Sequence, residues 1–368
     1  MLIGLTYYYP NLSGLTKYVE LLAENLVKKN IEVEVICSKH EKSLKLRESI
    51  RGVSVFRVGG LRLGKGIIMP TYPFLALAKV RKSDVVNCHL PSIESFWLAF
   101  WSKIFKRKLI VTYHCFYGNN SVSKILINII HNIVCLFADK IVVNTKDYVI
   151  ENGLLGFFRK KLVEISPPME TKNANKDEDQ EITEKICFKK KEKIIGFLGR
   201  ISSEKNIELI FETIPFLNRQ GINFKIVLAG PDDVVGEEKY QQKIDRLIKK
   251  YKNKVVKIGK IKNPVAFLTK CDCLVLPSND RLESFGMVQV EAMRCGTPSV
   301  ATNLPGMRIP VAESGGGELF KNRDSRDLAD KLVTVLKQGK KYYQKRMKLE
   351  MFDYKESIDR YEEIFLEN

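Results

Sequence analysis

Two glutamates bracket a short loop whose residue types suit the binding of sugars and phosphates. Glu283 precedes the run Ser284, Phe285, Gly286 and Met287, and Glu291 lies inside a helix expected over residues 288–294. Backbone N–H groups at a helix start lack partners within the helix and lie at its positive end, so they attract phosphate or sugar oxygens. Gly286 has no side chain that would keep a ligand away from the backbone. One extended ligand with hydroxyls at both ends could therefore meet both carboxylates.

The alternative is that both glutamates are ordinary solvated side chains. The expected helix is otherwise apolar and small, with Val288, Val290, Ala292 and Met293. A carboxylate in so apolar a helix needs a partner. This favours a binding role for the pair.

A second group of polar residues follows the strand expected over residues 193–198. Gly199 and Arg200 come directly after it, Lys205 follows, and Ser202 or Ser203 is expected to cap a helix that runs to Leu217. Two cations beside the free amides of a helix start suit a diphosphate. Solvated cations are the alternative.

The first half of the chain alternates between strands and helices, which predicts a parallel sheet covered on both faces. A strand over 2–8 leads through Gly14 to a helix that Thr16 is expected to cap. Further strands are expected over 32–37, 53–58, 84–88, 109–113 and 140–144, and helices over 92–105 and 122–137. His89 and His114 follow two of these strands, at the sheet edge where ligands bind. Structural hydrogen bonding is the alternative for each histidine.

The spacing Glu283-x7-Glu291 around Ser-Phe-Gly, followed by Ala-Met-x-x-Gly-x-Pro-x-Val-Ala, resembles the signature of retaining glycosyltransferase family four. The resemblance is strong over 190–310 and weaker over 1–165. It implies an α/β protein with the GT-B fold, in which two Rossmann-like domains face each other across a deep cleft. The expected domains are 1–168, joined by a last helix at about 350–368, and 169–349; residues 171–192 are expected to be a linker.

The resemblance also implies roles for individual residues. Glu283 would contact hydroxyls of the donor sugar, and His114 would face that sugar and support the reaction centre. Glu291 would bind the nucleotide ribose. Arg200 and Lys205 would hold the diphosphate and stabilise it as it leaves. The remaining donor contacts are expected at Gly14, Ile261, Ser284, Phe285, Gly286 and Met287.

Two departures from the family pattern accompany these roles. Relatives usually have two adjacent glycines where this chain has Ser13 and Gly14, and an acidic residue where it has Cys115. The chain has no Asp-x-Asp element at a comparable strand end. The expected enzyme therefore uses neither a metal nor another cofactor.

The implied activity is retaining transfer of a hexosyl group from a UDP- or GDP-sugar to a glycan or lipid-linked acceptor, in the assembly of cell-surface polysaccharide or glycolipid. Two other classes of function stay open. One is a different GT-B activity, such as a sugar-nucleotide epimerase or a phosphorylase. The other is a non-catalytic protein that binds a membrane surface or another polyanion, which the net charge of +18 would suit.

Composition and charge bear on location and partners. The chain is 45% apolar and 28% charged, without an apolar stretch long enough to span a membrane. Its first residues are expected to form a strand rather than a signal peptide. Its eight scattered cysteines suit a reducing compartment, so a cytoplasmic protein is expected.

The positive charge is concentrated in residues 1–168, with 24 Lys and Arg against 12 Asp and Glu; the other 200 residues have 37 against 31. Residues 96–108 combine five aromatic side chains with a basic end. They are interpreted either as core or, with the loop 60–82, as a patch on an anionic membrane. No nucleic-acid-binding motif appears, so peripheral attachment to the inner face of the membrane is the expected association.

Overall fold

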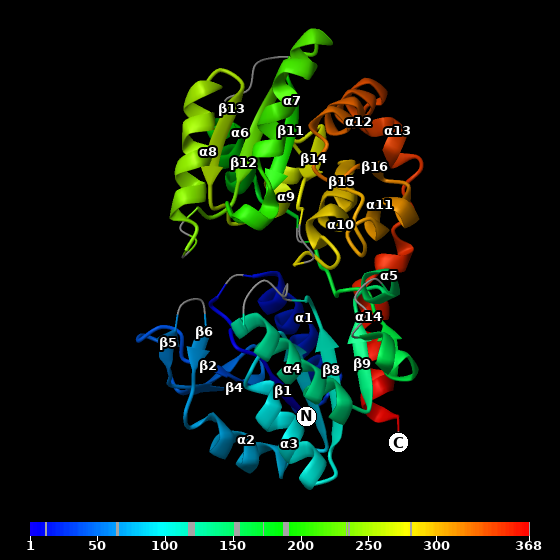
Figure 1. Cartoon of the computed structure of the whole chain (residues 1–368). Helices are drawn as coiled ribbons and strands as arrows, with labels where there is room; N and C mark the ends of the chain where they lie inside the picture. The colour runs from blue at the N-terminus through cyan, green and yellow to red at the C-terminus, as the bar shows by residue number, and fades with distance from the viewer. Residues whose placement is uncertain are drawn as a thin grey trace. The chain divides into compact units, whose positions relative to one another are not determined.

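The computed structural model describes residues 1–11, 13–63, 66–116, 122–150, 155–171, 173–186, 191–232, 234, 236–279 and 282–367. The chain divides into two units (Figure 1). Unit 1 comprises Met1–Met169 and Phe352–Asn368, and unit 2 comprises Glu170–Met351. The end of the chain therefore packs with the beginning.

Unit 1 is built on an eight-stranded sheet in the order β10-β9-β8-β7-β1-β2-β4-β3. Only β3 runs antiparallel to its neighbour. The strands are β1 (Leu2–Gly4), β2 (Glu34–Ser38), β3 (Arg47–Ile50), β4 (Val53–Val58), β7 (Val85–Leu90), β8 (Lys108–Tyr113), β9 (Lys140–Val143) and β10 (Leu162–Glu164). A separate hairpin pairs β5 (Leu61–Leu63) with β6 (Gly66–Ile68).

Helices cover both faces of this sheet. One face packs against α1 (Gly14–Lys28) and α14 (Tyr354–Leu366), with Leu22 and Ile358 among the buried side chains. The other packs against α2 (Tyr72–Val80), α3 (Ser95–Ile104) and α4 (Val122–Phe137), with Leu98 and Val134 in its core. The short helices α5 (Lys146–Ile150) and η1 (Leu155–Lys161) precede the last strand. Burial on both faces explains the nearly unbroken apolar runs of β7 to β9.

Unit 2 contains a six-stranded, fully parallel sheet in the order β13-β12-β11-β14-β15-β16. Its strands are β11 (Lys193–Leu198), β12 (Phe224–Ala229), β13 (Val255–Gly259), β14 (Cys273–Leu276), β15 (Ser299–Thr302) and β16 (Gly317–Phe320). The order is that of a dinucleotide-binding Rossmann sheet. The direction of strand addition reverses between β11 and β14, and ligands bind at such a switch point beyond the carboxyl ends of the strands. In unit 1 the same reversal lies between β1 and β7.

Helices also cover both faces of the second sheet. One face buries residues of α7 (Glu208–Arg219), α8 (Glu238–Lys250) and α12 (Ser325–Gln338). The other buries residues of α6 (Lys176–Ile186), α9 (Pro264–Leu268) and α10 (Met287–Arg294). Shorter elements are η2 (Ser203–Lys205), α11 (Ile309–Ser314), α13 (Lys340–Gln344) and η3 (Glu350–Phe352).

Several predicted boundaries are wrong. The first helix begins at Gly14, and Ser13 rather than Thr16 caps it. Neither Ser202 nor Ser203 caps α7, because that helix begins at Glu208 after the short η2 turn. The expected linker at 171–192 contains α6, whose buried stripe of Ile182 and Ile186 is too narrow to create a visible period.

Two expected loops also contain regular structure. Residues 60–82 form the β5–β6 hairpin and α2, and the Gly- and Pro-rich region after Asn303 contains α11. Among the described residues, no helix is both long and apolar enough to cross a membrane.

Candidate functional site

The residues predicted to bind the diphosphate and the donor sugar lie on two loops at the switch point of unit 2. The first loop follows β11 and carries Arg200 and Lys205; the second follows β14 and carries Glu283. The Asn206 side-chain amide donates to the Pro277 carbonyl at 3.3 Å, and the Asn279 N–H donates to the Glu204 carbonyl at 3.3 Å. These bonds hold the two loops side by side.

Glu283 joins the loops through its carboxylate. Its Oε2 accepts a hydrogen bond from the Lys205 ammonium in a close ion pair, and its Oε1 accepts from the Gly286 N–H at 3.0 Å. The two side chains are 16% (Lys205) and 22% (Glu283) exposed, so solvent screens their attraction only in part. Lys205, predicted to bind the diphosphate, and Glu283, predicted to bind the sugar, thus form an ion pair with each other here.

Gly286 fits the turn between Glu283 and α10 for two separate reasons. Its φ is +75°, in the left-handed region, and a Cβ atom would come within 2.4 Å of Gln289 Nε2 and 2.7 Å of a Leu276 methyl group. Gln289 is buried and donates to the carbonyls of Met307 at 2.8 Å and Phe285 at 3.4 Å. Sequence reasoning missed Gln289, although a Gln in an apolar helix carries the same signal as Glu291.

The rest of the signature is buried. Ser284 is 7% exposed, Phe285 2% and Glu291 8%, and Met287 is the first residue of α10. The interpretation of Glu291 as a solvated side chain is therefore wrong. Glu291 lies in α10 about one helical turn after its first residue.

Arg200 and Ile261 follow β11 and β13, two strands of unit 2 that are separated by β12. The Arg200 guanidinium is half exposed and donates to Glu204 Oε1 at 3.1 Å, which also accepts from the Ser202 hydroxyl at 2.6 Å. Ile261 follows β13 and packs partly against the core between α6 and α9. A Cβ atom on Gly230, at the end of β12, would lie 2.0 Å from the Gly199 carbonyl oxygen. The loops after β11 and β12 therefore approach each other backbone to backbone.

The other predicted residues lie in unit 1. Gly14 is exposed and is the first residue of α1, in the segment that follows β1. His114 follows β8 directly, its N–H donates to the Leu90 carbonyl at 3.0 Å, and it is 8% exposed. His89 lies within β7 rather than after it and is fully buried, so the expectation that it follows the strand at the ligand-binding edge of the sheet is wrong.

The two histidines belong to one buried polar network. His89 Nε2 lies 2.7 Å from Asn87 Oδ1, and His89 Nδ1 lies 2.8 Å from His114 Nε2. Burial lowers the pKa of His114 to about 3 and the pKa of His89 well below its usual value, so both rings are neutral. The Tyr18 ring packs edge-on against His114, with centroids 4.7 Å apart.

Glu94 is a further polar residue that sequence reasoning missed. It follows β7 at the switch point of unit 1, where its Oε2 accepts from the hydroxyls of Thr6 at 3.3 Å and Ser92 at 3.0 Å. Burial raises the pKa of its carboxyl group. The residues between His89 and Glu94 contain no glycine that would have marked a ligand-facing loop.

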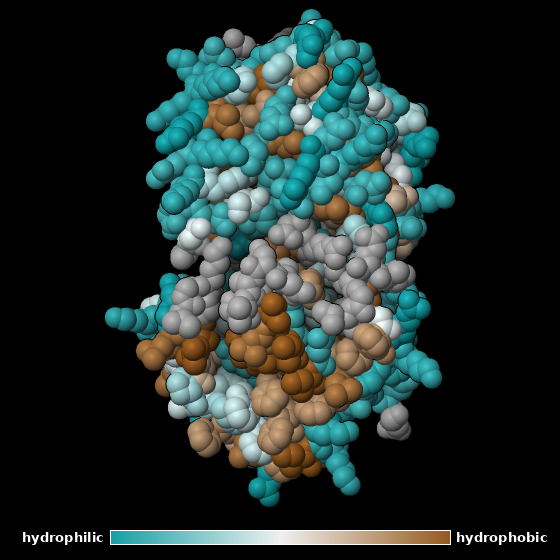
Figure 2. Space-filling model, viewed as in Figure 1, coloured by the Kyte–Doolittle hydropathy of each residue, from teal (hydrophilic) through white to brown (hydrophobic). Residues whose placement is uncertain are grey.

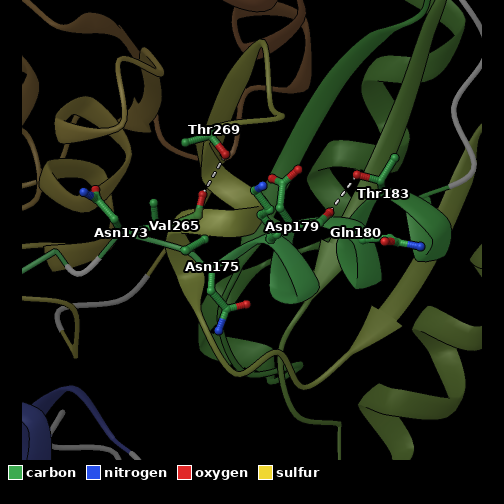
Figure 3. Close-up of a pocket in the computed structure, with 9 residues that line it drawn as sticks. Asn173, Asn175, Asp179, Gln180, Thr183, Val265 and Thr269 are labelled. Atoms are coloured by element: carbon green, nitrogen blue, oxygen red, sulfur yellow. Dashed lines mark hydrogen bonds between the residues drawn. The ribbon is translucent and has the colours of Figure 1, made fainter.

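A shallow pocket is lined by residues of α6, of α9 and of the segment before α6 (Figure 3). Its lining includes Asp179, Thr183 and Thr269. Both threonine hydroxyls donate to carbonyls of their own helices, and Asp179 lies 2.8 Å from the Lys270 ammonium. Each of these three side chains therefore already has a partner. In the part of the chain that the structure describes, no three His, Cys, Asp or Glu side chains are grouped as metal ligands would be.

Comparison with known proteins gives two family matches that follow one another along the chain. Residues 12–168 match the model described as "Glycosyltransferase Family 4", and residues 178–350 match the one described as "Glycosyl transferases group 1". An uncharacterised glycosyltransferase of Methanocaldococcus jannaschii is 24% identical over 348 residues, covering 89% of this chain and 86% of that protein. A capsular polysaccharide biosynthesis glycosyltransferase of Staphylococcus aureus is 26% identical over 143 residues, covering 39% of this chain and 36% of that protein.

Solved structures of the same fold match the whole chain. HepE from Anabaena, in complex with UDP-glucose, has a TM-score of 0.79 at 17% identity and covers 99% of this chain and 98% of its own. Sucrose-phosphate synthase from Thermosynechococcus elongatus has a TM-score of 0.75 at 19% identity, with full coverage of both chains. At these identities the likeness concerns the fold, which is the predicted GT-B fold.

Proposed function

The chain belongs to the group 1 glycosyltransferases, and we propose that it transfers a hexosyl group, with retention of configuration, from a UDP- or GDP-sugar to a glycan or lipid-linked acceptor. The observation that carries the proposal is the junction of Lys205, Glu283 and Gly286 at the switch point of unit 2. A cation, a carboxylate and a helix start meet there, as a sugar diphosphate requires.

The donor would be held mainly by unit 2. Arg200 and Lys205 would bind the diphosphate, the backbone of 284–287 would bind sugar and phosphate oxygens, and Glu291 would accept hydrogen bonds from the ribose. The backbone at Ile261 would contact the base. The half-exposed Arg200 can reorient toward an anion at little cost. Lys205 would exchange its Glu283 carboxylate for the diphosphate.

His114 and Gly14 would complete the donor site from unit 1. In the transfer step, the bond between the anomeric carbon and the diphosphate oxygen breaks, and an acceptor oxygen forms the new bond on the same face of the sugar. The acceptor proton passes to the departing phosphate oxygen. Arg200 and Lys205 neutralise the charge that develops on the diphosphate, so the step as proposed needs no metal.

Calorimetry with UDP and with GDP, each with and without Mg²⁺, tests the donor site. We expect one nucleotide to bind, independently of Mg²⁺, and binding to weaken roughly tenfold or more in Glu291→Ala, as for loss of a hydrogen bond to a charged group. Glu313→Ala is the matched control, because Glu313 is exposed on α11 of the same unit. Failure of both nucleotides to bind would contradict the proposal and favour the binding-protein alternative. Donor conversion without an acceptor would favour an epimerase.

An anionic membrane is the proposed setting for the acceptor. Large apolar side chains are exposed on the helices over one face of unit 1, where Figure 2 shows brown surface over α3 and α4. They are Phe74, Trp97, Ile104, Ile125, Leu126, Ile129, Leu136 and Phe157. Exposed basic residues occur in the same elements or next to them: Lys103, Lys106, Arg159 and Lys160. Apolar side chains with adjacent cations suit the headgroup region of an anionic bilayer.

Residues 96–108, interpreted from the sequence either as core or as a surface patch, contribute to both. Trp101 donates from its indole to the Pro73 carbonyl at 3.1 Å and packs partly against the core, as do Phe96 and Phe105. Trp97 is 36% exposed. The stretch therefore contributes to both core and surface.

Sedimentation with vesicles tests the membrane setting. We expect the protein to bind vesicles that contain phosphatidylglycerol, to bind pure phosphatidylcholine vesicles less, and to lose binding in Leu126→Glu/Ile129→Glu. Leu366→Glu is the control, since Leu366 is 67% exposed on α14, over the opposite face of the same sheet. Equal binding by the two variants would contradict the assignment of this surface.

A further inference from the structure

Asn87, His89 and His114 form a chain of hydrogen bonds whose polarity can be worked out from its far end. The Asn87 amide nitrogen donates to the Ile110 carbonyl at 3.2 Å and to Thr112 Oγ1 at 3.1 Å. The opposite orientation of the amide would place two carbonyl oxygens against each other. Asn87 Oδ1 is therefore the atom that faces His89, and it can only accept.

The protons on the two histidine rings follow from this. Since Asn87 Oδ1 accepts, His89 Nε2 carries a hydrogen and donates across 2.7 Å. His89 is fully buried and its pKa is well below its usual value, so the ring is neutral and its Nδ1 bears a lone pair. The 2.8 Å contact between His89 Nδ1 and His114 Nε2 must then be a hydrogen bond donated by His114.

His114 thus presents a defined atom for recognition. With its hydrogen on Nε2 and a neutral ring, its Nδ1 is a bare acceptor. Among the described residues, no side chain or backbone group forms a hydrogen bond with Nδ1 of His114, and the residue keeps 8% of its surface exposed.

We infer that His89, held by Asn87, is a positioning residue that fixes His114 in the tautomer protonated at Nε2, so that His114 Nδ1 accepts a hydrogen bond from a hydroxyl of the donor sugar. The inference rests on the proposed function for its ligand, and it limits which donor sugars fit the site. The group of the sugar that meets His114 must be a hydrogen-bond donor. A sugar with a carboxylate at that position would face a lone pair and is disfavoured.

The network also connects this pair to the end of the chain. Thr112 Oγ1, which accepts from Asn87, lies 3.0 Å from the Tyr361 hydroxyl, and that hydroxyl lies 2.7 Å from the Tyr18 hydroxyl. Tyr361 belongs to α14 and Tyr18 to α1, the two helices that cover this face of the sheet. The polarity at His114 is therefore set by groups anchored on several elements of unit 1, so a single side-chain rotation does not reverse it.

Nitrogen NMR of the full-length protein with ring-labelled histidine tests the inference. Correlation of ring protons with ring nitrogens separates protonated from bare nitrogens. The chain has four histidines, so substitution of one at a time assigns each set of ring signals to its residue. We expect His89 and His114 both to show the pattern of a neutral ring protonated at Nε2, unchanged from pH 6 to pH 8. A hydrogen on Nδ1 of His114 would overturn the inference.

Two substitutions separate positioning from simple support of the fold. His89→Phe removes the acceptor, so the His114 signals should shift toward a mixture of tautomers. His89→Asn can return an oxygen near the position of Nδ1 and should restore the wild-type pattern. His131→Phe is the control. His131 is 1% exposed in the same unit, and it accepts a hydrogen bond from the Ser92 N–H rather than belonging to the hydrogen-bonded series of Asn87, His89 and His114. An unchanged His114 pattern in His89→Phe would contradict the inference.

Nucleotide binding serves as a separate readout. The loops around Glu283 belong to unit 2, so His89→Phe should bind UDP or GDP as the wild type does. If neither nucleotide binds to the wild type, the proposed function fails, but nitrogen NMR still determines the tautomer of His114. If His89→Phe does not fold, the wild-type pattern and His89→Asn still decide the question.

Discussion

Glu283 neutralises Lys205 across the two loops that a donor diphosphate is proposed to enter. The pair stabilises the empty site, because the carboxylate also caps the turn through the Gly286 N–H at 3.0 Å. A diphosphate that recruits Lys205 must compete with Glu283 for the ammonium. The same contact that preorders the loops therefore weakens the affinity for phosphate.

Glu283→Gln separates these two effects. Without the carboxylate, the Lys205 ammonium is free for phosphate, and we expect the free nucleoside diphosphate to bind more tightly by up to roughly fivefold, as for a partly exposed ion pair of up to about 1 kcal/mol. The nucleotide sugar should gain less, because it loses the contact between Glu283 and a sugar hydroxyl. Calorimetry with both ligands measures the difference.

Glu204→Gln provides the comparison for this experiment. It releases Arg200, which is half exposed and already screened, so the gain in nucleotide affinity should be smaller. Weaker binding of the free nucleotide to Glu283→Gln would mean that Glu283 acts mainly by ordering the loop.

Gly286→Ala should destabilise unit 2 and abolish nucleotide binding. An Ala at φ +75° costs about 1–2 kcal/mol, and the overlap with Gln289 and Leu276 adds about 1–3 kcal/mol. Gly221→Ala is the matched control, since Gly221 has φ +68° with open space around the added Cβ. Circular dichroism in urea should show a clear loss of stability for Gly286→Ala and a loss of about 1 kcal/mol for Gly221→Ala. Equal losses would mean that backbone conformation alone requires glycine at 286.

Tyr361→Phe should destabilise unit 1 through its partners. It leaves the buried hydroxyls of Tyr18 and Thr112 without the Tyr361 oxygen, which costs about 1–3 kcal/mol. Both tryptophans of the chain, Trp97 and Trp101, lie in unit 1, so their fluorescence reports its unfolding.

A double-mutant cycle identifies the origin of that loss. Tyr18→Phe/Tyr361→Phe should cost less than the sum of the single changes, because the second substitution removes a group already left unpaired. Tyr9→Phe, at a tyrosine of the same unit that is 40% exposed, is the control. Strict additivity would show that the two hydroxyls are not coupled.

The glycosyltransferase family and the two sheets could be predicted from the sequence because their signals are local. The run from Lys193 to Leu198 is a strand as expected, and Gly286 and Gly296 mark the start and end of α10. What could not be predicted depends on contacts between distant residues. The pairing of Lys205 with Glu283 joins positions 78 residues apart. The contact between Tyr18 and Tyr361 joins positions 343 residues apart.

His89 shows the same limit in a single residue. A strand boundary placed at Cys88 makes it a ligand contact, whereas β7 continues to Leu90 and buries it. Two residues of strand length thus change its role from substrate contact to support. Boundaries are the least certain part of any pattern, and here a role depends on one.

Glu20 should make the stability of unit 1 fall as the pH rises from about 4.5 to about 7. Burial, with the neighbouring Glu24 carboxylate, raises the pKa of Glu20 to about 7, while Arg51 and Lys17 lower it less. The folded state therefore holds this proton more tightly than the unfolded chain does, and stability is lost as pH rises through the folded pKa. Glu20→Gln removes the ionisation, so its stability relative to wild type should be smallest at pH 4, rise between about pH 4.5 and 7, and reach a plateau above pH 7. Urea midpoints by tryptophan fluorescence at pH 4, 5, 6, 7 and 8 measure this difference, and a difference independent of pH would contradict the prediction.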